Sequence, residues 1–207
     1  GAILSDLSPI ATFIASNYNA PVNAAAFSRE ARRILREVEA ECGWMYQTSH
    51  PGSHTLDGLA VQGKVIYTVW SDVFLCPYCG QEIVFYDAAM DQRSGRLMRK
   101  FACSSCGSEL TKRSLEHANE RIYDKVLDTE IVQNKQVPVL ISYKVGTTRF
   151  KKRPDEDDLA LIQRVKESEI PYWHPSYRML FREGAWGDIW RAGYHTGVTH
   201  SHHFYYR

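Results

Sequence analysis

Two short cysteine motifs lie near the middle of this 207-residue chain: Cys76-Pro77-Tyr78-Cys79-Gly80 and Cys103-Ser104-Ser105-Cys106-Gly107. In each motif two residues separate the cysteines, a spacing that lets one tight turn point both sulfur atoms at a single metal ion. The glycine after each second cysteine permits a backbone conformation in which nearby amides donate to the thiolates. The motifs predict a zinc ribbon in which Cys76, Cys79, Cys103 and Cys106 hold one structural Zn²⁺.

Four thiolates complete a tetrahedral zinc shell and leave no position for water or substrate, so we expect a structural rather than a catalytic ion. A rubredoxin-like iron site and two disulfides are the alternative uses of the same cysteines. The fifth cysteine, Cys42, extends an apolar helical stripe and is predicted to be a buried thiol. Paired Cys-x-x-Cys motifs favour a reducing compartment, here the cytoplasm, over a secreted disulfide framework.

The overall composition is that of an ordinary globular protein. The net charge is +1, so any basic surface must be local. No apolar run approaches the roughly 20 residues that span a bilayer, and no signal-peptide pattern is present. These features give no general argument for a membrane or a nucleic-acid partner.

The periodicity of the remaining sequence predicts an α+β fold: a helical N-terminal segment, a four-cysteine zinc-ribbon β-hairpin, and a small antiparallel sheet with further helices. Helices are predicted over residues 9–18, 23–42, 114–126 and 154–168. Strands are predicted over residues 2–7, 63–73, 82–86, 96–102, 137–145 and 147–151, and a loop over 50–58. The segments 82–86 and 96–102 are expected to pair with each other as the ribbon hairpin.

Three segments together resemble a known family. They are ILSDLSPIA (3–11), the strand and two cysteine motifs of residues 67–107, and RAGYHTG (191–197) with FYYR (204–207). In this order they are similar to the DNA methylases that modify N4 of cytosine or N6 of adenine, in the subgroup with a zinc-ribbon insertion. The resemblance implies an S-adenosylmethionine-dependent parent enzyme.

In that family, Asp6 matches the carboxylate that binds the ribose hydroxyls of S-adenosylmethionine; the alternative is a capping residue in the same turn. The family's glycine-rich loop would precede Ala2, and its Pro-Pro-Tyr motif, which holds the flipped base, would follow Arg207. We therefore expect an internal piece of a longer enzyme that by itself neither methylates DNA nor binds the cofactor tightly. Its predicted domains are 1–62, a strand and helices continuing from the missing catalytic core; 63–113, a strand and the ribbon; and 114–207, an α+β segment with an aromatic tail that leads back to that core.

An inserted region in such an enzyme is expected to contact double-stranded DNA, besides the remainder of the methyltransferase chain. The candidate DNA-binding residues are Arg93, Arg96, Arg99, Lys100, Arg149, Lys151 and Lys152. The aromatic residues of the tail could stack on bases or pack on the catalytic domain. The alternatives are a free-standing zinc-ribbon adaptor for protein or nucleic acid, and a purely structural spacer.

The histidines near the end of the chain suggest a second metal site only weakly. If residues 200–203 form a strand, His200 and His202 share one face and His203 points the other way. No carboxylate or cysteine lies nearby in sequence. The acidic run 155–158 favours a helix N-terminus over a metal site, and His117 is expected on the surface of a helix.

Overall fold

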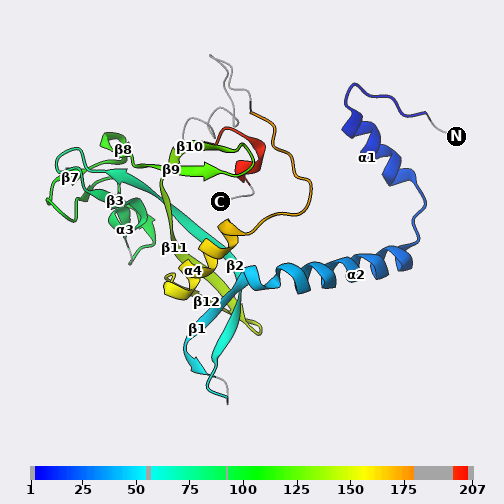
Figure 1. Cartoon of the computed structure of the whole chain (residues 1–207), viewed down its shortest axis with the longest axis horizontal. Helices are drawn as coiled ribbons and strands as arrows, with labels where there is room; N and C mark the ends of the chain where they lie inside the picture. The colour runs from blue at the N-terminus through cyan, green and yellow to red at the C-terminus, as the bar shows by residue number, and fades with distance from the viewer. Residues whose placement is uncertain (1–2, 55–56, 92, 180–197, 205–207) are drawn as a thin grey trace. The chain divides into compact units, whose positions relative to one another are not determined.

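The computed structural model describes residues 3–54, 57–91, 93–179 and 198–204. The chain divides into two compact units, Gly1–Trp44 and Met45–Arg207. The secondary structure confirms the predicted α+β class, with four α-helices and antiparallel sheets among the described residues. Figure 1 labels the four α-helices and most of the strands.

The first unit consists of helices α1 (Pro9–Asn19) and α2 (Ala24–Cys42), both as predicted. The Asn23 side chain caps α2 by accepting a hydrogen bond from the Ala26 amide at 3.0 Å. Every residue of both helices is described and none is buried, so the apolar stripe of α2 is exposed and Cys42 is only half-buried. The strand predicted at residues 2–7 is wrong for residues 3–7, because no described segment pairs with them.

A four-stranded antiparallel path forms the centre of the second unit, in the order β1 (Gln47–His54), β2 (Ala60–Leu75), β11 (Gln136–Val145) and β12 (Thr148–Lys152). Strands β11 and β12 correspond to the strands predicted at 137–145 and 147–151. They pair as a hairpin, and Gly146 makes its turn at a φ of 58°. Strand β1 replaces most of the predicted loop, because an irregularity between Ser49 and His54 accommodates Pro51 and Gly52. The short helix η1 (Gly43–Tyr46) precedes β1.

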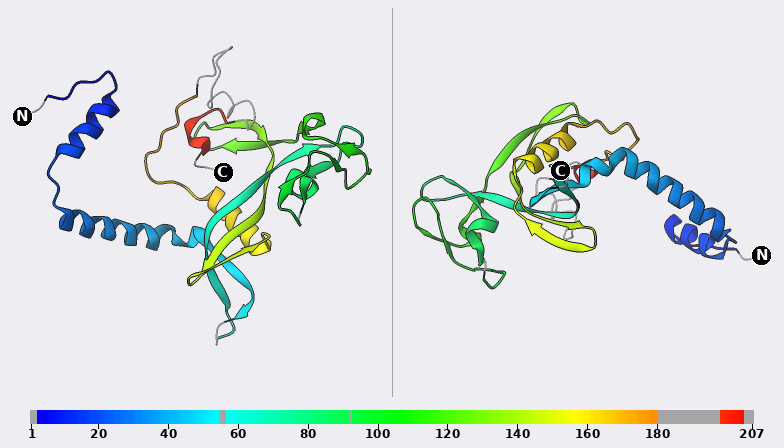
Figure 2. Two further views of the ribbon diagram at one scale, coloured as in Figure 1. Left: turned by 180° about the vertical axis from the view of Figure 1, so that it is seen from behind. Right: turned by 90° about the horizontal axis from the view of Figure 1, so that it is seen from below.

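Helix α4 (Glu156–Glu167) covers one face of this sheet (Figure 2). Asp155 and Asp158 form a capping box at its start, so the acidic run opens a helix as predicted. Lys152 links β12 to this helix, with its ammonium 2.8 Å from Asp158 and 2.5 Å from Asp155. On the same face Gly63 allows β2 to approach β11, because a Cβ atom there would lie 2.4 Å from the Tyr143 ring.

The ribbon begins where β2 leaves the sheet. Its elements are β3 (Glu82–Val84), α3 (Phe85–Ala89), β4 (Met90–Asp91), β5 (Arg96–Leu97), β6 (Phe101–Ala102), β7 (Glu109–Leu110), η2 (Lys112–Ser114) and β8 (Glu116–His117). Strand β3 pairs with β2, while β4 pairs with β5 and β6 with β7. The predicted pairing of 82–86 with 96–102 is therefore wrong, because the long strand β2 supplies the partner for β3. Ile83, Phe101 and Leu110 pack with the buried cysteines as the ribbon core.

Residues 114–126, predicted as a helix, instead form β8 and β9 (Asn119–Asp124), and β9 pairs with β10 (Thr129–Asn134). The alternation of Arg121, Ile122 and Tyr123 fits a strand, and it decides the structure once β10 supplies a partner. His117 accordingly lies on β8, half-buried, with its ring centroid 4.5 Å from that of Phe74. The short helix η3 (Ser201–Phe204) lies beside this hairpin (Figure 1).

Candidate metal centre and cationic face

The two cysteine motifs fold into matching turns. The Cys76 amide donates to the Gln81 carbonyl and the Gly80 amide to the Cys76 carbonyl, at 2.9 and 2.8 Å. The second motif repeats this pattern, from Cys103 to Ser108 and from Gly107 to Cys103, both at 2.9 Å. The glycines have φ of 72° and 73°, as the sequence predicts. Two structurally equivalent turns therefore present two sulfurs each.

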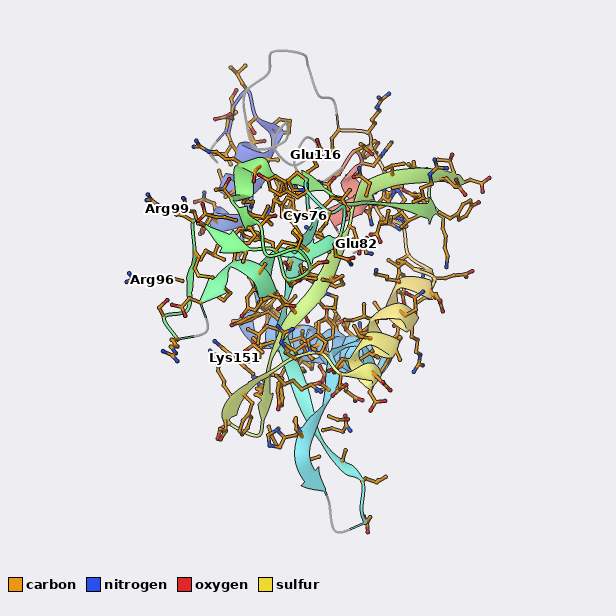
Figure 3. All side chains as sticks on the ribbon, turned by 90° about the vertical axis from the view of Figure 1, so that its left-hand side faces the viewer. Cys76, Glu82, Arg96, Arg99, Glu116 and Lys151 are labelled. Atoms are coloured by element: carbon orange, nitrogen blue, oxygen red, sulfur yellow. The ribbon has the colours of Figure 1, made fainter. Side chains whose placement is uncertain are left out.

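The four sulfurs form a cluster that can hold one metal ion. The Sγ atoms of Cys76 and Cys106 lie 3.8 Å apart, as do those of Cys79 and Cys103. Four sulfurs at about 2.3 Å from a tetrahedral zinc ion would be separated by about 3.8 Å, so the spacing fits that geometry. All five cysteines are free, which excludes the disulfide alternative in this structure. Figure 3 shows Cys76 in the interior of the ribbon.

The surroundings of the sulfurs favour a bound cation. The hydroxyl and amide of Ser108 lower the pKa of Cys106 to about 6. Amides of Cys106 and Ser105 lower the pKa of Cys103 as well. Although the Gln81 amide opposes it, burial and the three neighbouring sulfurs raise the pKa of Cys79 to about 11. Four adjacent thiols cannot all ionise without a compensating positive charge, and a metal ion supplies that charge.

Of the seven basic residues predicted to bind DNA, five are exposed without an ion pair to a described residue, and two are engaged by carboxylates. Arg93, Arg96 and Arg99 on the ribbon and Arg149 and Lys151 on β12 are exposed, and none has an ion pair with a described residue. In Figure 3, Arg96, Arg99 and Lys151 extend along the same side of the second unit. The ribbon and the sheet thus direct cationic side chains the same way.

Two of the predicted DNA-binding residues are occupied elsewhere. The prediction that Lys152 contacts DNA does not fit its position. Its side chain is only 7% exposed, and the ammonium binds Asp155, Asp158 and the Ser49 carbonyl. It holds α4 on the sheet, and its charge is already compensated by the two carboxylates. Lys100 is exposed but pairs with Glu109 at 2.8 Å. Contact of either ammonium with DNA would require breaking an existing interaction.

The sheet adds a cation that sequence reasoning missed, Lys144. Its register partners are Arg149 on β12 and Lys64 on β2, and all three residues are exposed. Tyr143, next to Lys144, is buried on the face that α4 covers, so Lys144 belongs to the opposite face. Strand alternation alone could have identified it. We define the cationic face as Lys64, Lys144, Arg149 and Lys151.

An ion pair joins the end of β12 to the ribbon. The Arg153 guanidinium contacts the Asp87 carboxylate of α3, and both side chains are partly exposed. Strand β2 also runs from the cationic face directly into the ribbon, where Phe74 and Leu75 pair with both β3 and β8. The two sets of cations are therefore carried by one continuous framework.

Asp6, the candidate for ribose binding, is exposed at the start of the first unit. Its Oδ1 accepts a hydrogen bond from the Ser8 amide at 2.7 Å, immediately before α1. This contact matches the turn-capping role that the sequence leaves open. The carboxylate retains acceptor capacity on its second oxygen.

The terminal histidines lie differently from the prediction. Because residues 201–204 form a 3₁₀ turn rather than a strand, His202 and His203 point to the same place. Their Nε2 atoms lie 2.8 and 2.9 Å from Oδ2 of Asp124, at the end of β9. All three residues are buried and line a cavity of about 450 Å³. His195, a further histidine near the end of the chain, lies outside the described residues.

The aromatic tail is described only in part. Tyr172, Trp173 and Tyr177 are largely exposed, whereas residues 180–197 and 205–207 lie outside the described residues. The family-like segment 191–197 and Tyr205 and Tyr206 are therefore without a structural account.

No described helix combines the length and the apolar character needed to cross a membrane. No protein-family model, curated protein or solved structure matches this chain, so the geometry of its sites carries the functional argument.

Proposed function

We propose that this chain is a zinc-stapled, DNA-contacting region inserted in an S-adenosylmethionine-dependent DNA methyltransferase that acts on exocyclic amines. The observation that carries the DNA-binding part is the cationic face, where Lys144 and Arg149 lie directly opposite each other. The methyltransferase part rests on the sequence resemblance. We take the ion of the four-cysteine cluster to be Zn²⁺, because four thiolates in a tetrahedral arrangement suit that ion.

Repulsion between the like charges of the cationic face lowers the stability of the sheet, and an anionic partner would offset that repulsion. Like charges on directly opposed residues destabilise a sheet, typically by a few tenths of a kcal/mol to about 1 kcal/mol. Arg149 and Lys151 alternate with the buried side of β12, so both stay on the same face as Lys144. A row of phosphates would neutralise these cations together, as duplex DNA does along each strand.

The ribbon extends this surface. Arg96 and Arg99 extend to the same side as Lys151, and the Arg153–Asp87 pair ties the two regions together (Figure 3). Arginine can bind phosphate bidentately or read guanine in the major groove, whereas the sheet lysines are suited to phosphate contact. We assign positioning on the backbone to the cationic face and place any base reading on the ribbon arginines.

The direct test is fluorescence anisotropy with a labelled DNA duplex at fixed salt concentration. The triple variant Lys144→Gln/Arg149→Gln/Lys151→Gln removes three charges without touching the buried face of the sheet. We expect its affinity for duplex DNA to fall at least tenfold relative to the unchanged chain.

The matched control is Arg29→Gln/Arg32→Gln/Arg36→Gln, which removes three exposed charges from α2. It should bind DNA as the unchanged chain does. Equal losses of affinity in both variants would mean that DNA binding depends on the net charge of the chain rather than on the cationic face. No binding by the unchanged chain would favour the adaptor or spacer alternatives.

The cofactor part of the proposal has its own test. Asp6 is the one residue that the resemblance assigns to the cofactor, and the expected glycine-rich loop is not within this sequence. Isothermal titration calorimetry of this chain with S-adenosylmethionine should therefore show no tight binding. A clear isotherm with this chain would contradict the expectation that tight cofactor binding requires the glycine-rich loop.

A further inference from the structure

We infer that Asp124, His202 and His203 form a second metal site, which takes a six-coordinate first-row divalent ion such as Fe²⁺ or Co²⁺. The proposal is independent of DNA binding and of the four-cysteine cluster. It concerns three residues that the sequence separates widely, since Asp124 and His202 are 78 positions apart.

The ligand atoms converge on one point. Oδ2 of Asp124 lies 2.8 Å from Nε2 of His202 and 2.9 Å from Nε2 of His203, and all three atoms fall within 4.8 Å of one another. Two imidazoles and one carboxylate are the donor set of non-haem iron sites that keep open positions. A structural tie would need only one histidine on this oxygen, whereas both adjacent histidines are directed to it.

The two carboxylate–imidazole spacings fit neighbouring positions around a six-coordinate ion. Ligands about 2.1 Å from an ion and at right angles to each other are separated by about 3.0 Å, whereas a tetrahedral ion separates them by about 3.4 Å. The observed 2.8 and 2.9 Å are closer to the first value. The four-cysteine cluster shows the contrast, because its 3.8 Å spacings fit a tetrahedral ion with longer metal–sulfur bonds.

The surroundings of the site would support an ion. Oδ1 of Asp124 accepts hydrogen bonds from the Val126 and Leu127 amides at 2.9 and 3.1 Å, which fixes the carboxylate with Oδ2 toward the histidines. The three residues line the cavity of about 450 Å³, which offers an entry path and space for water or a small ligand at the remaining positions. The His200 ring lies 5.6 and 5.4 Å from the rings of His202 and His203, as a nearby further donor.

Without a metal ion, the same atoms form hydrogen bonds. The Thr199 amide donates to Nδ1 of His203 at 3.2 Å, which places the imidazole proton on Nε2, facing Asp124. A bound ion takes the place of that proton on Nε2, and the same proton moves to Nδ1. The long Thr199 contact then opens, because Nδ1 no longer accepts a hydrogen bond. Metal binding and the hydrogen-bonded tie are thus alternative states of one cluster.

The test begins with the unchanged chain. Protein loaded with one equivalent of zinc is dialysed against Co²⁺ and then against metal-free buffer, and both metals are counted by mass spectrometry. We expect one zinc and one cobalt per chain. A weak, six-coordinate cobalt spectrum and hyperfine-shifted signals from two histidine ring N–H groups would place the cobalt at this site. Zinc alone, or the intense bands of cobalt bound to thiolates, would overturn the proposal.

Two variants in one hairpin assign the ligand. Asp124→Asn should lose the cobalt and keep the zinc. Asp128→Asn removes the same charge four residues away, at a φ of 52° that asparagine tolerates, and should keep both ions. Loss of cobalt from both variants, or from neither, would contradict Asp124 as the ligand. The unchanged chain's count decides the proposal even if Asp124→Asn folds poorly.

Discussion

The ribbon and helix α2 differ in what their sequence patterns determine. The ribbon places Ile83, Phe101 and Leu110 in a buried core beside its cysteines. Helix α2 has an equally regular apolar stripe, yet Phe27 and Leu35 are each 67% exposed. A metal-ligand pattern determines its own contacts, because all of its cysteines bind the same ion. An apolar stripe determines a face but not what packs against it.

Removal of the metal should have the largest effect and should be confined to the second unit. The Cys76→Ser/Cys106→Ser variant breaks the cluster, and structural zinc contributes on the order of 10 kcal/mol to folding in small zinc domains. Hydrogen exchange should lose protection at Phe101 and Leu110 while α2 keeps its own pattern. Undiminished protection in the ribbon would show that its apolar core suffices without the ion.

Lys152→Met tests the contact between α4 and the sheet. It leaves Asp158 buried without its cation, and loss of one partner of a buried pair costs about 3–5 kcal/mol. Chemical denaturation at neutral pH should show this loss. A variant as stable as the unchanged chain would mean that the ion pair contributes no more than apolar packing.

The same cluster predicts a pH dependence. Although burial opposes it, Lys152 holds the pKa of Asp155 below its ordinary value. The stability that this ion pair contributes is therefore present above about pH 4 and is lost as the pH falls further. Although burial opposes it too, Asp155 and Asp158 raise the pKa of Lys152, so its share is lost only above about pH 10.4. Denaturation across pH 2–7 should show a shallower acid decline in Lys152→Met. Parallel declines would place the titrating groups elsewhere.

Gly63→Ala is expected to have a smaller effect on the second unit. Its Cβ would meet the buried Tyr143 ring at 2.4 Å, and overpacking of this kind costs about 1–3 kcal/mol. Gly52→Ala in β1 is the contrasting substitution: no atom of the described residues lies within 4 Å of its Cβ position, but its φ is 71°. Its free energy of unfolding should fall only by the strain that alanine has at that φ, about 1 kcal/mol. Equal losses would attribute both effects to backbone strain rather than to packing.

The smallest effect is expected on α2. Leu35→Ser changes an exposed apolar residue and should alter the free energy of unfolding by no more than about 0.5 kcal/mol. Circular dichroism during denaturation measures it. A loss of several kcal/mol would mean that this stripe is covered in solution, and would remove the contrast with the ribbon.

The parts of the fold that could be predicted are those set by neighbouring residues. The spacing of Cys76 and Cys79, the glycine at the β11–β12 turn and the acidic start of α4 act within a few positions. The pairing of β3 with β2, and of β9 with β10, could not be read, because strand partners depend on distant segments. The cluster around Asp124 was missed for the same reason. Lys144 could have been found, since alternation along β11 places it opposite the buried Tyr143.

The salt dependence of DNA binding measures directly whether the cationic face contacts phosphates. The logarithm of the association constant is measured against the logarithm of salt concentration for the unchanged chain and for Lys144→Gln/Arg149→Gln/Lys151→Gln. Each phosphate contact contributes about 0.9 to the slope, so the variant should be shallower by about 2–3. Parallel lines, or binding that does not respond to salt, would contradict a cationic face that holds the DNA backbone.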